Sequence, residues 1–239
     1  MGSATTQALA TTTAELTAAK PGDLTVSREL FAAAREIADS TQLSGALSTW
    51  GAPGSARAQI ATSVFAGYSP AARQLIASAV SQRWSSTADL ISGIEELAIR
   101  AAAIGGATAD VEGELFEVSR VVAGNPELEL ALGGRLGDAS AKGALVEKLF
   151  GARVGEATTL IVSQLVQQPR ERRIRALLSR ALRIVAMGRR RAEQRHHIVA
   201  DMFIDAPAAL QDDVVGEREE AAQHGMSLFR IDFAGKCRI

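Results

Sequence analysis

Hydrophobic side chains recur every three to four positions along most of the chain, the spacing that places them on one face of an α-helix. A second signal is Ser69-Pro70, a serine cap followed by a proline suited to the first helical position. The pattern predicts a mostly α-helical protein. Its clearest apolar stripe follows Pro169, which is expected to open a long final helix, and consists of Ile174, Leu177, Leu178, Ala181 and Val185.

Cap and break signals divide the first half of the chain into short helices. Ser27 is predicted to cap one helix, and Pro53-Gly54-Ser55 to break the chain before another that points Ile60 and Val64 inward. Ser86-x-x-Asp89 has the pattern of a capping box and predicts the start of a further helix. The pattern changes after about residue 196. Residues 198–204 and 227–233 are expected to form strands around an acidic helix over 208–224, a tail too short to complete an α/β domain.

An internal repeat organises the chain. Glu29-Leu30-Phe31-x-x-x-Arg35 recurs 85 positions later as Glu114-Leu115-Phe116-x-x-x-Arg120. Keeping this shift without a gap also places Phe65 on Phe150 and Leu75-Ile76 on Leu160-Ile161. A period of this length indicates a duplicated small domain and not a solenoid. We expect two tandem helical bundles, over residues 1–107 and 108–195, followed by an incomplete α/β remnant over residues 196–239.

Composition and charge narrow the classes of function. The chain has 239 residues, 26 basic and 27 acidic side chains and a formal charge of −1, so no global field draws it to nucleic acid or anionic lipid. Aromatic residues make up only 4% of the chain, which favours helices over β-sandwiches. The single cysteine, Cys237, excludes an internal disulfide and suits a reducing compartment. No stretch approaches the roughly 20 apolar residues of a membrane span, and the Thr-rich start lacks the features of a signal peptide.

Residues 170–195 hold ten arginines and two glutamates, a density that suggests binding to nucleic acid, to a membrane surface or to an acidic protein. No aromatic side chains are interleaved to stack on bases, and the apolar side lacks Trp and Phe for membrane insertion. We therefore favour a solvated face or docking to an acidic partner. On a helical wheel the residues opposite the apolar stripe are Arg172, Arg173, Arg180, Arg183, Arg190 and Arg191.

Four other features could carry chemistry, and each has a structural interpretation that we favour. His196-His197 are adjacent and point apart, so they are poorly placed to bind one metal ion. Gly133-Gly134-Arg135-Leu136-Gly137 lacks the residue order of a phosphate-binding loop. Cys237 has no histidine nearby in the sequence to activate it as a nucleophile. Glu112, Glu114 and Glu117 crowd a helix start, where carboxylates favour the macrodipole. The sequence therefore predicts no catalytic, cofactor or metal site, and it leaves the partner-binding residues undetermined.

The second copy resembles the delta subunit of the bacterial F-type ATP synthase, called the oligomycin-sensitivity-conferring subunit in mitochondria, in its long actinobacterial form. The likeness extends from Asp110 to Ala200. It is carried by Glu114-Leu115-Phe116-Glu117-Val118, Asn125-Pro126-Glu127-Leu128, Ala131-Leu132, Lys142-x-x-Leu145-Val146-x-x-Leu149-Phe150, the stretch from Arg170 to Arg183, and Arg195-His196-His197-Ile198-Val199-Ala200.

The resemblance implies a peripheral-stalk subunit that binds partners and catalyses no reaction. In that family the helical bundle holds the N-terminal helix of an alpha subunit on the catalytic head, and a C-terminal α/β domain binds the membrane-anchored b subunit. These contacts resist rotation of the head at the cytoplasmic face of the plasma membrane. The copy from Asp110 to Arg195 is the expected head-binding unit, although either copy or both could bind.

Beyond Ala200 the sequence departs from the family pattern, and a frameshift or truncation would explain this departure. Attachment to the b subunit is therefore less supported than binding to the alpha subunit. The rival interpretation is a helical adaptor that uses its arginine-rich face on nucleic acid or an acidic protein. Salt would discriminate the two, because phosphate binding falls steeply with ionic strength.

Overall fold

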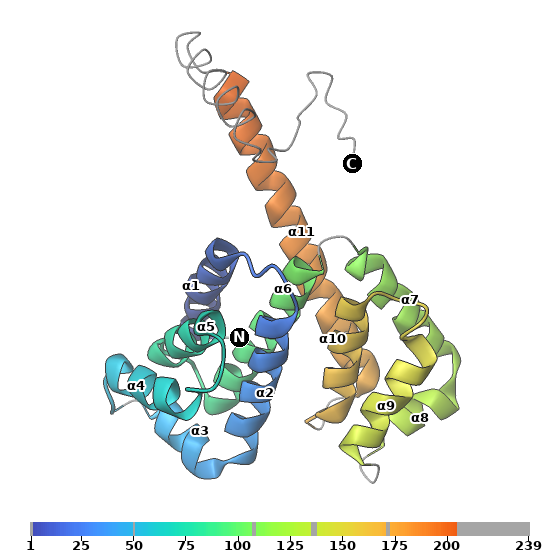
Figure 1. Cartoon of the computed structure of the whole chain (residues 1–239), viewed down its shortest axis with the longest axis horizontal. Coiled ribbons are helices and arrows are strands. Elements are labelled where there is room, and N and C mark those ends of the chain that lie inside the picture. The colour runs from blue at the N-terminus through green and yellow to red at the C-terminus, as the bar shows by residue number, and fades with distance from the viewer. Residues whose placement is uncertain (1, 50, 107–108, 135–137, 171–172, 205–239) are drawn as a thin grey trace. The chain divides into compact units, whose positions relative to one another are not determined.

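The computed structural model describes residues 2–49, 51–106, 109–134, 138–170 and 173–204, and within these ranges it is built from eleven α-helices without a strand (Figure 1). The prediction of a mostly α-helical fold is therefore confirmed. The chain divides into a compact unit of residues 1–188 and a second unit that starts at Arg189. The domain boundaries expected near residues 107 and 195 remain predictions.

Two of the predicted cap signals mark helix starts among the first six helices. The hydroxyl of Ser69 accepts the Ala72 N–H, and the hydroxyl of Ser86 accepts the Asp89 N–H, so both predicted caps are present. Each satisfies a backbone donor that a helix start would leave unpaired. The helices are α1 (Ser3–Ala19), α2 (Thr25–Asp39), α3 (Thr41–Ser48), α4 (Gly54–Val64), α5 (Pro70–Ser81) and α6 (Thr87–Gly105).

The remaining helices repeat the spacing of α2 to α6. Helices α3 and α4 recur 85 positions later as α8 and α9, and α5 recurs 86 positions later as α10. The gapless register is therefore wrong after Phe150, because α9 is one residue longer than α4. Burial agrees, since Leu75 and Ile76 match the buried Ile161 and Val162. The helices are α7 (Val111–Gly124), α8 (Pro126–Gly133), α9 (Ala139–Phe150), α10 (Glu156–Gln167) and α11 (Ile174–Ile204).

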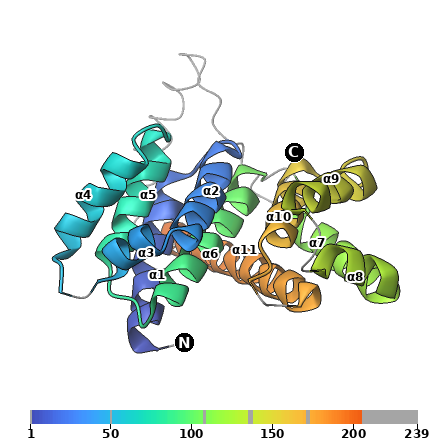
Figure 2. The ribbon, with the colours of Figure 1, turned by 90° about the horizontal axis from the view of Figure 1, so that it is seen from below.

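One apolar core runs through residues 1–188. Leu30 and its counterpart Leu115 are fully buried, and Phe65 and Phe150 are 1% and 5% exposed. Burying a large apolar side chain contributes about 1.5–3 kcal/mol. The predicted stripe on α11 is confirmed, because each of its five members is buried. Helix α6 is buried along most of its length and packs against both α2 and α10, as Figure 2 shows from below.

Two predictions about side-chain direction in the first copy are wrong. Ser27 does not cap α2, which begins at Thr25. It is fully buried and donates its hydroxyl to the Ala98 carbonyl of α6 at 2.9 Å. Ile60 and Val64 are 38% and 47% exposed, while the other face of α4 turns inward and buries Arg57. A tertiary contact decides the direction in each case.

The end of the described chain also differs from the prediction. The last helix begins at Ile174 and not at Pro169, and Arg170 before it has a positive φ of 43°, which lies outside the helical region. Residues 198–204 continue α11 and do not form a strand. The helix predicted over 208–224 and the strand predicted over 227–233 lie outside the described residues.

Candidate partner-binding surface

A carboxylate cap is repeated in both copies. Glu29 of α2 accepts the backbone N–H of Ser69 at 2.9 Å and its hydroxyl at 2.5 Å, at the start of α5. Glu114 of α7 accepts the backbone N–H of Gly155 at 3.0 Å and the hydroxyl of Thr158 at 2.5 Å, at the start of α10. Both carboxylates lie at a helix N-terminus, where the macrodipole favours negative charge. Glu114 is thus explained as a structural cap.

A buried cation binds backbone carbonyls at a helix end in each copy. The guanidinium of Arg57 is 8% exposed and donates to the carbonyls of Val80, Ser81 and Gln82, at the end of α5, and to two carbonyls beyond α3. Its counterpart, Lys142, is 7% exposed and donates to the carbonyl of Gly134 beyond α8. Carbonyls at a helix end lack intrahelical donors, so each cation completes a C-terminus.

The arginine-rich stretch is only partly the solvated face that we expected. Arg173, Arg183, Arg190 and Arg191 are exposed, while Arg172 lies outside the described residues. Arg180 differs, because its side chain is 16% exposed and donates to the Ser92 carbonyl of α6 at 2.8 Å. This arginine helps to join α11 to α6 and does not lie on a free basic surface.

The partners of Arg180 on α6 are buried carboxylates, which the helical wheel of α11 alone could not reveal. Glu95 and Glu96 are 5% and 7% exposed, and Arg180 lies within 3.6 and 3.4 Å of them. Glu96 also pairs with Arg100 at 2.7 Å. Because a buried charge needs a partner, this cluster fixes how α11 lies on α6.

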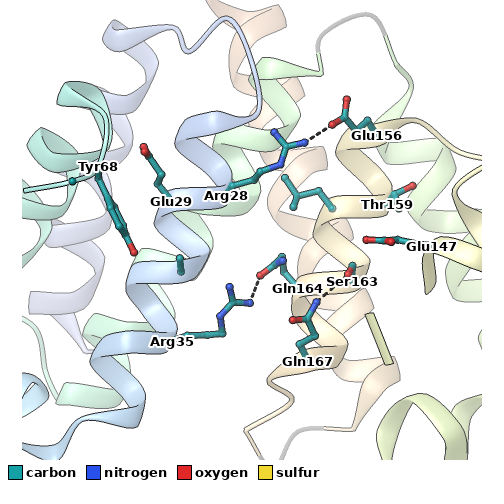
Figure 3. Close-up of a pocket in the computed structure, with 13 residues that line it drawn as sticks. Arg28, Glu29, Arg35, Tyr68, Glu147, Glu156, Thr159, Ser163, Gln164 and Gln167 are labelled. Atoms are coloured by element: carbon teal, nitrogen blue, oxygen red, sulfur yellow. Dashed lines mark hydrogen bonds and ion pairs between the residues drawn. The ribbon is translucent and has the colours of Figure 1, made fainter. Parts of the chain in front are cut away.

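Helix α2 of the first copy lies beside α10 of the second. Arg28 pairs with Glu156, and Arg35 donates to the Gln164 side chain, as Figure 3 shows. A cavity of about 800 Å³ remains between the two helices and has a polar lining. At its edge Tyr68 donates to Glu36 at 2.6 Å, and burial together with this carboxylate raises the pKa of Tyr68. Helices α2 and α10 are thus joined by the polar contacts of Arg28 and Arg35.

Helices α1 and α5 form a second helix pair, within the first copy. They pack against each other, and the Thr5 hydroxyl of α1 lies within hydrogen-bond distance of Ser85, just before α6, at 3.0 Å and of Asp89 in α6 at 3.2 Å. On α1 the side chains of Thr6 and Ala10 are exposed. On α5 the Arg73 Nε and Ser78 Oγ atoms are buried without a hydrogen-bond partner among the described residues. The sequence analysis missed this surface, because the Thr- and Ala-rich α1 has no marked polar and apolar faces.

The other candidate features remain structural or untested. Glu112 is half-buried in the first turn of α7, and Glu117 is exposed beside Arg120. Gly133 and Gly134 lie at the end of α8, while residues 135–137 and Cys237 lie outside the described part of the chain, as do the side chains of His196 and His197. Among the described residues no group of histidines, cysteines and carboxylates could hold a metal ion, and no helix is long and apolar enough to span a bilayer.

The fold belongs to the class of α-helical scaffold proteins with a repeated helical unit. Its buried charged side chains join helices to one another. Comparison with curated proteins identifies the family. The chain is 42% identical over 188 residues to the ATP synthase subunit delta of Leifsonia xyli, a match that covers 78% of this chain and 72% of that protein. It is also 35% identical over 158 residues to the subunit of Nocardia farcinica and 39% identical over 130 residues to that of Streptomyces griseus.

The chain belongs to the ATP synthase delta-subunit family, whose members are peripheral-stalk subunits of the membrane-associated F-type ATP synthase. No protein-family profile matches it. The matches to the Nocardia and Streptomyces proteins cover 64% and 53% of this chain but only 59% and 46% of those proteins. The rival interpretation as a nucleic-acid adaptor is not favoured, and Arg175 and Arg180 of the basic stretch pair with Glu129 and Glu96 within the fold.

Proposed function

We propose that the chain acts as a non-catalytic stator subunit, holding the N-terminal helix of an alpha subunit and so keeping the catalytic head from turning with the rotor. The observation that carries this proposal is the 42% identity that extends over 78% of the chain to an actinobacterial delta subunit. The site of action is the cytoplasmic face of the bacterial plasma membrane. Attachment to the b subunit is the second, less supported contact, because the sequence after Ala200 departs from the family.

The described surface supports static recognition of a helix. Helices α1 and α5 lie side by side and present exposed small side chains, such as Ala10, against which another helix can approach closely. A helix held against such a surface uses apolar anchors at every third or fourth position for most of its affinity.

The direct test is binding of a synthetic peptide with the sequence of the alpha-subunit N-terminus from the same organism. A stator contact must outlast many turnovers, so we expect a dissociation constant in the nanomolar range, or about −12 kcal/mol. Calorimetry should show that binding persists when the salt concentration is raised to 0.5 M. A peptide that fails to bind at micromolar concentration would refute the proposal. If instead the chain binds duplex DNA with an affinity that falls steeply with salt, the adaptor interpretation is correct.

A further inference from the structure

The cavity between α2 and α10 lies where the two copies meet, and it has the size of a ligand site. Its volume of about 800 Å³ falls within the range of roughly 300–1,000 Å³ that is usual for small-molecule pockets, which also occur between the helices of bundles. On α10 the side chains of Thr159, Ser163 and Gln167 line it, and because they recur every four positions they share one face of the helix. A polar wall of this kind suits a hydrophilic ligand.

Two contacts cross this cavity. Arg28 pairs with Glu156, and Arg35 donates to the side-chain oxygen of Gln164, as Figure 3 shows. The two arginines are seven positions apart on α2, which is about 10 Å along the helix axis. A long partner helix does not fit between the two contacts, whereas a small molecule or a single side chain does.

The two arginines of the cavity differ in how their charge is balanced. Arg28 forms an ion pair, but the hydrogen bond that the structure gives Arg35, among the residues it describes, goes to the neutral amide of Gln164. Arg35 is half-buried, and a cation removed from water is stabilised by an anion beside it. A guanidinium has five N–H donors, so several donors of Arg35 are left for a ligand or water.

The carboxylates that line the cavity are used in other ways. Glu29 caps α5 with both of its oxygens, and Glu156 is paired with Arg28. Glu147, on α9, is exposed to solvent. None of these three, in the part of the chain that the structure describes, forms an ion pair with Arg35. The protein itself therefore leaves the place of an anion beside this arginine open.

A hydrogen-bond donor lies on the opposite wall. Ser163 is only 4% exposed and accepts a hydrogen bond from Gln167 at 3.0 Å. Within the described residues its own hydroxyl donates to no acceptor. The cavity thus offers an oxyanion a cation on α2 and a hydroxyl donor on α10.

We propose that this cavity is a ligand site, with Arg35 as its anchor, for a small molecule or a side chain that carries a carboxylate or phosphate group. A guanidinium binds both groups through paired N–H donors. The site is separate from α1 and α5, and it does not depend on the stator function. Because its walls belong to different copies, a bound ligand joins the first copy to the second and should raise the melting temperature of the chain.

Calorimetry on the full chain at about 0.15 M salt tests the site with three probes: inorganic pyrophosphate, citrate and a blocked hexaglutamate peptide. The first two represent free anions, and the third represents an acidic side chain of a partner polypeptide. We expect saturable binding of at least one probe, at one per chain, with a dissociation constant below about 1 mM. Binding of the peptide alone would identify a partner's side chain as the ligand, and binding of citrate or pyrophosphate would identify a free anion.

Three variants assign the binding to the cavity. Arg35→Gln should weaken it at least about tenfold, because hydrogen bonds to a charged group are lost. Arg120→Gln is the matched control and should change it less than about twofold, since Arg120 holds the equivalent position in the second copy, is 67% exposed and does not line this cavity. Ala32→Phe fills the space beside Arg35 without a change of charge and should abolish binding.

No saturable binding of any probe by the unmodified chain would overturn the inference. Equal weakening by Arg35→Gln and Arg120→Gln, or unchanged binding by Ala32→Phe, would overturn it as well. Far-UV circular dichroism should show the same helical content in all three variants. If Arg35→Gln unfolds, binding by the folded Ala32→Phe variant decides the question. These outcomes leave the stator function untouched, because that function is tested with the alpha-subunit peptide.

Discussion

Arg57→Met should destabilise the first copy strongly. The arginine is 8% exposed and donates to the carbonyls of Val80 at 2.8 Å, Ala52 at 2.6 Å and Ser81 at 3.0 Å, with two longer bonds to Thr49 and Gln82. Methionine keeps the length of the side chain but donates none of these bonds. A hydrogen bond to a charged group contributes about 1.5–3 kcal/mol, and water can reach some of the freed carbonyls. We therefore expect a loss of about 3–5 kcal/mol in the free energy of unfolding.

Urea unfolding followed by tryptophan fluorescence measures this loss locally, because both tryptophans lie in the first copy and Trp84 is buried there. Arg57→Lys is the matched control. The second copy already uses a lysine at this position, with its bond to Gly134, so the lysine variant should lie between the wild type and the methionine variant. A loss below about 1 kcal/mol for Arg57→Met would show that these hydrogen bonds do not hold the helix ends together.

Three further predictions concern the carboxylate cap of α10, the close packing at Gly93 and the half-buried tyrosine. Glu114→Ala should lower the free energy of unfolding by about 1–2 kcal/mol by removing the cap of α10, while the exposed Glu117→Ala should have little effect in the same urea titration. Gly93→Ala should destabilise by about 1–3 kcal/mol, because its Cβ would lie 2.2 Å from the Trp84 ring; in α3, Gly45→Ala meets no neighbour and should raise the melting temperature. Tyr68 is the single tyrosine, and its pKa is raised in the folded chain, so absorbance at 295 nm should show a neutral phenol at pH 10. The phenol of the unfolded chain ionises near pH 10. The free energy of unfolding should therefore fall as the pH rises above that value. Equal losses of stability for Glu114→Ala and Glu117→Ala would contradict the cap of α10. A stable Gly93→Ala variant would contradict the close packing on Trp84, and an ordinary tyrosine titration in the folded chain would contradict the contact of Tyr68 with Glu36.

Local signals predicted the helices well. The Ser69-Pro70 start is encoded within four residues, because the serine side chain reaches a backbone donor three positions on. The apolar stripe of α11 is also a property of one helix. Both are therefore visible in the sequence without knowledge of what packs against them.

Long-range contacts explain what the sequence did not reveal. Ile60 and Val64 were expected inside, but α4 turns so that Arg57 reaches the end of α5. Arg180 was expected in solvent, but α6 provides the buried carboxylates of Glu95 and Glu96. In each case the deciding partner lies more than twenty positions away, so no local period contains it.

The partner surface was invisible for a related reason. Helix α1 is rich in Thr and Ala on all sides, so its sequence marks no binding face. The family likeness was visible in the second copy, while the proposed helix-binding pair, α1 and α5, lies in the first.

The most direct test is rebinding of the purified chain to catalytic heads from the same organism that have been stripped of their own delta subunit. The account predicts that the chain binds these heads with nanomolar affinity, and that excess alpha-subunit N-terminal peptide competes for this binding. Heads whose alpha subunits lack their N-terminal residues should not bind. Undiminished binding to such truncated heads, or no binding to intact ones, would contradict the assignment of the chain as the helix-holding link of the stator.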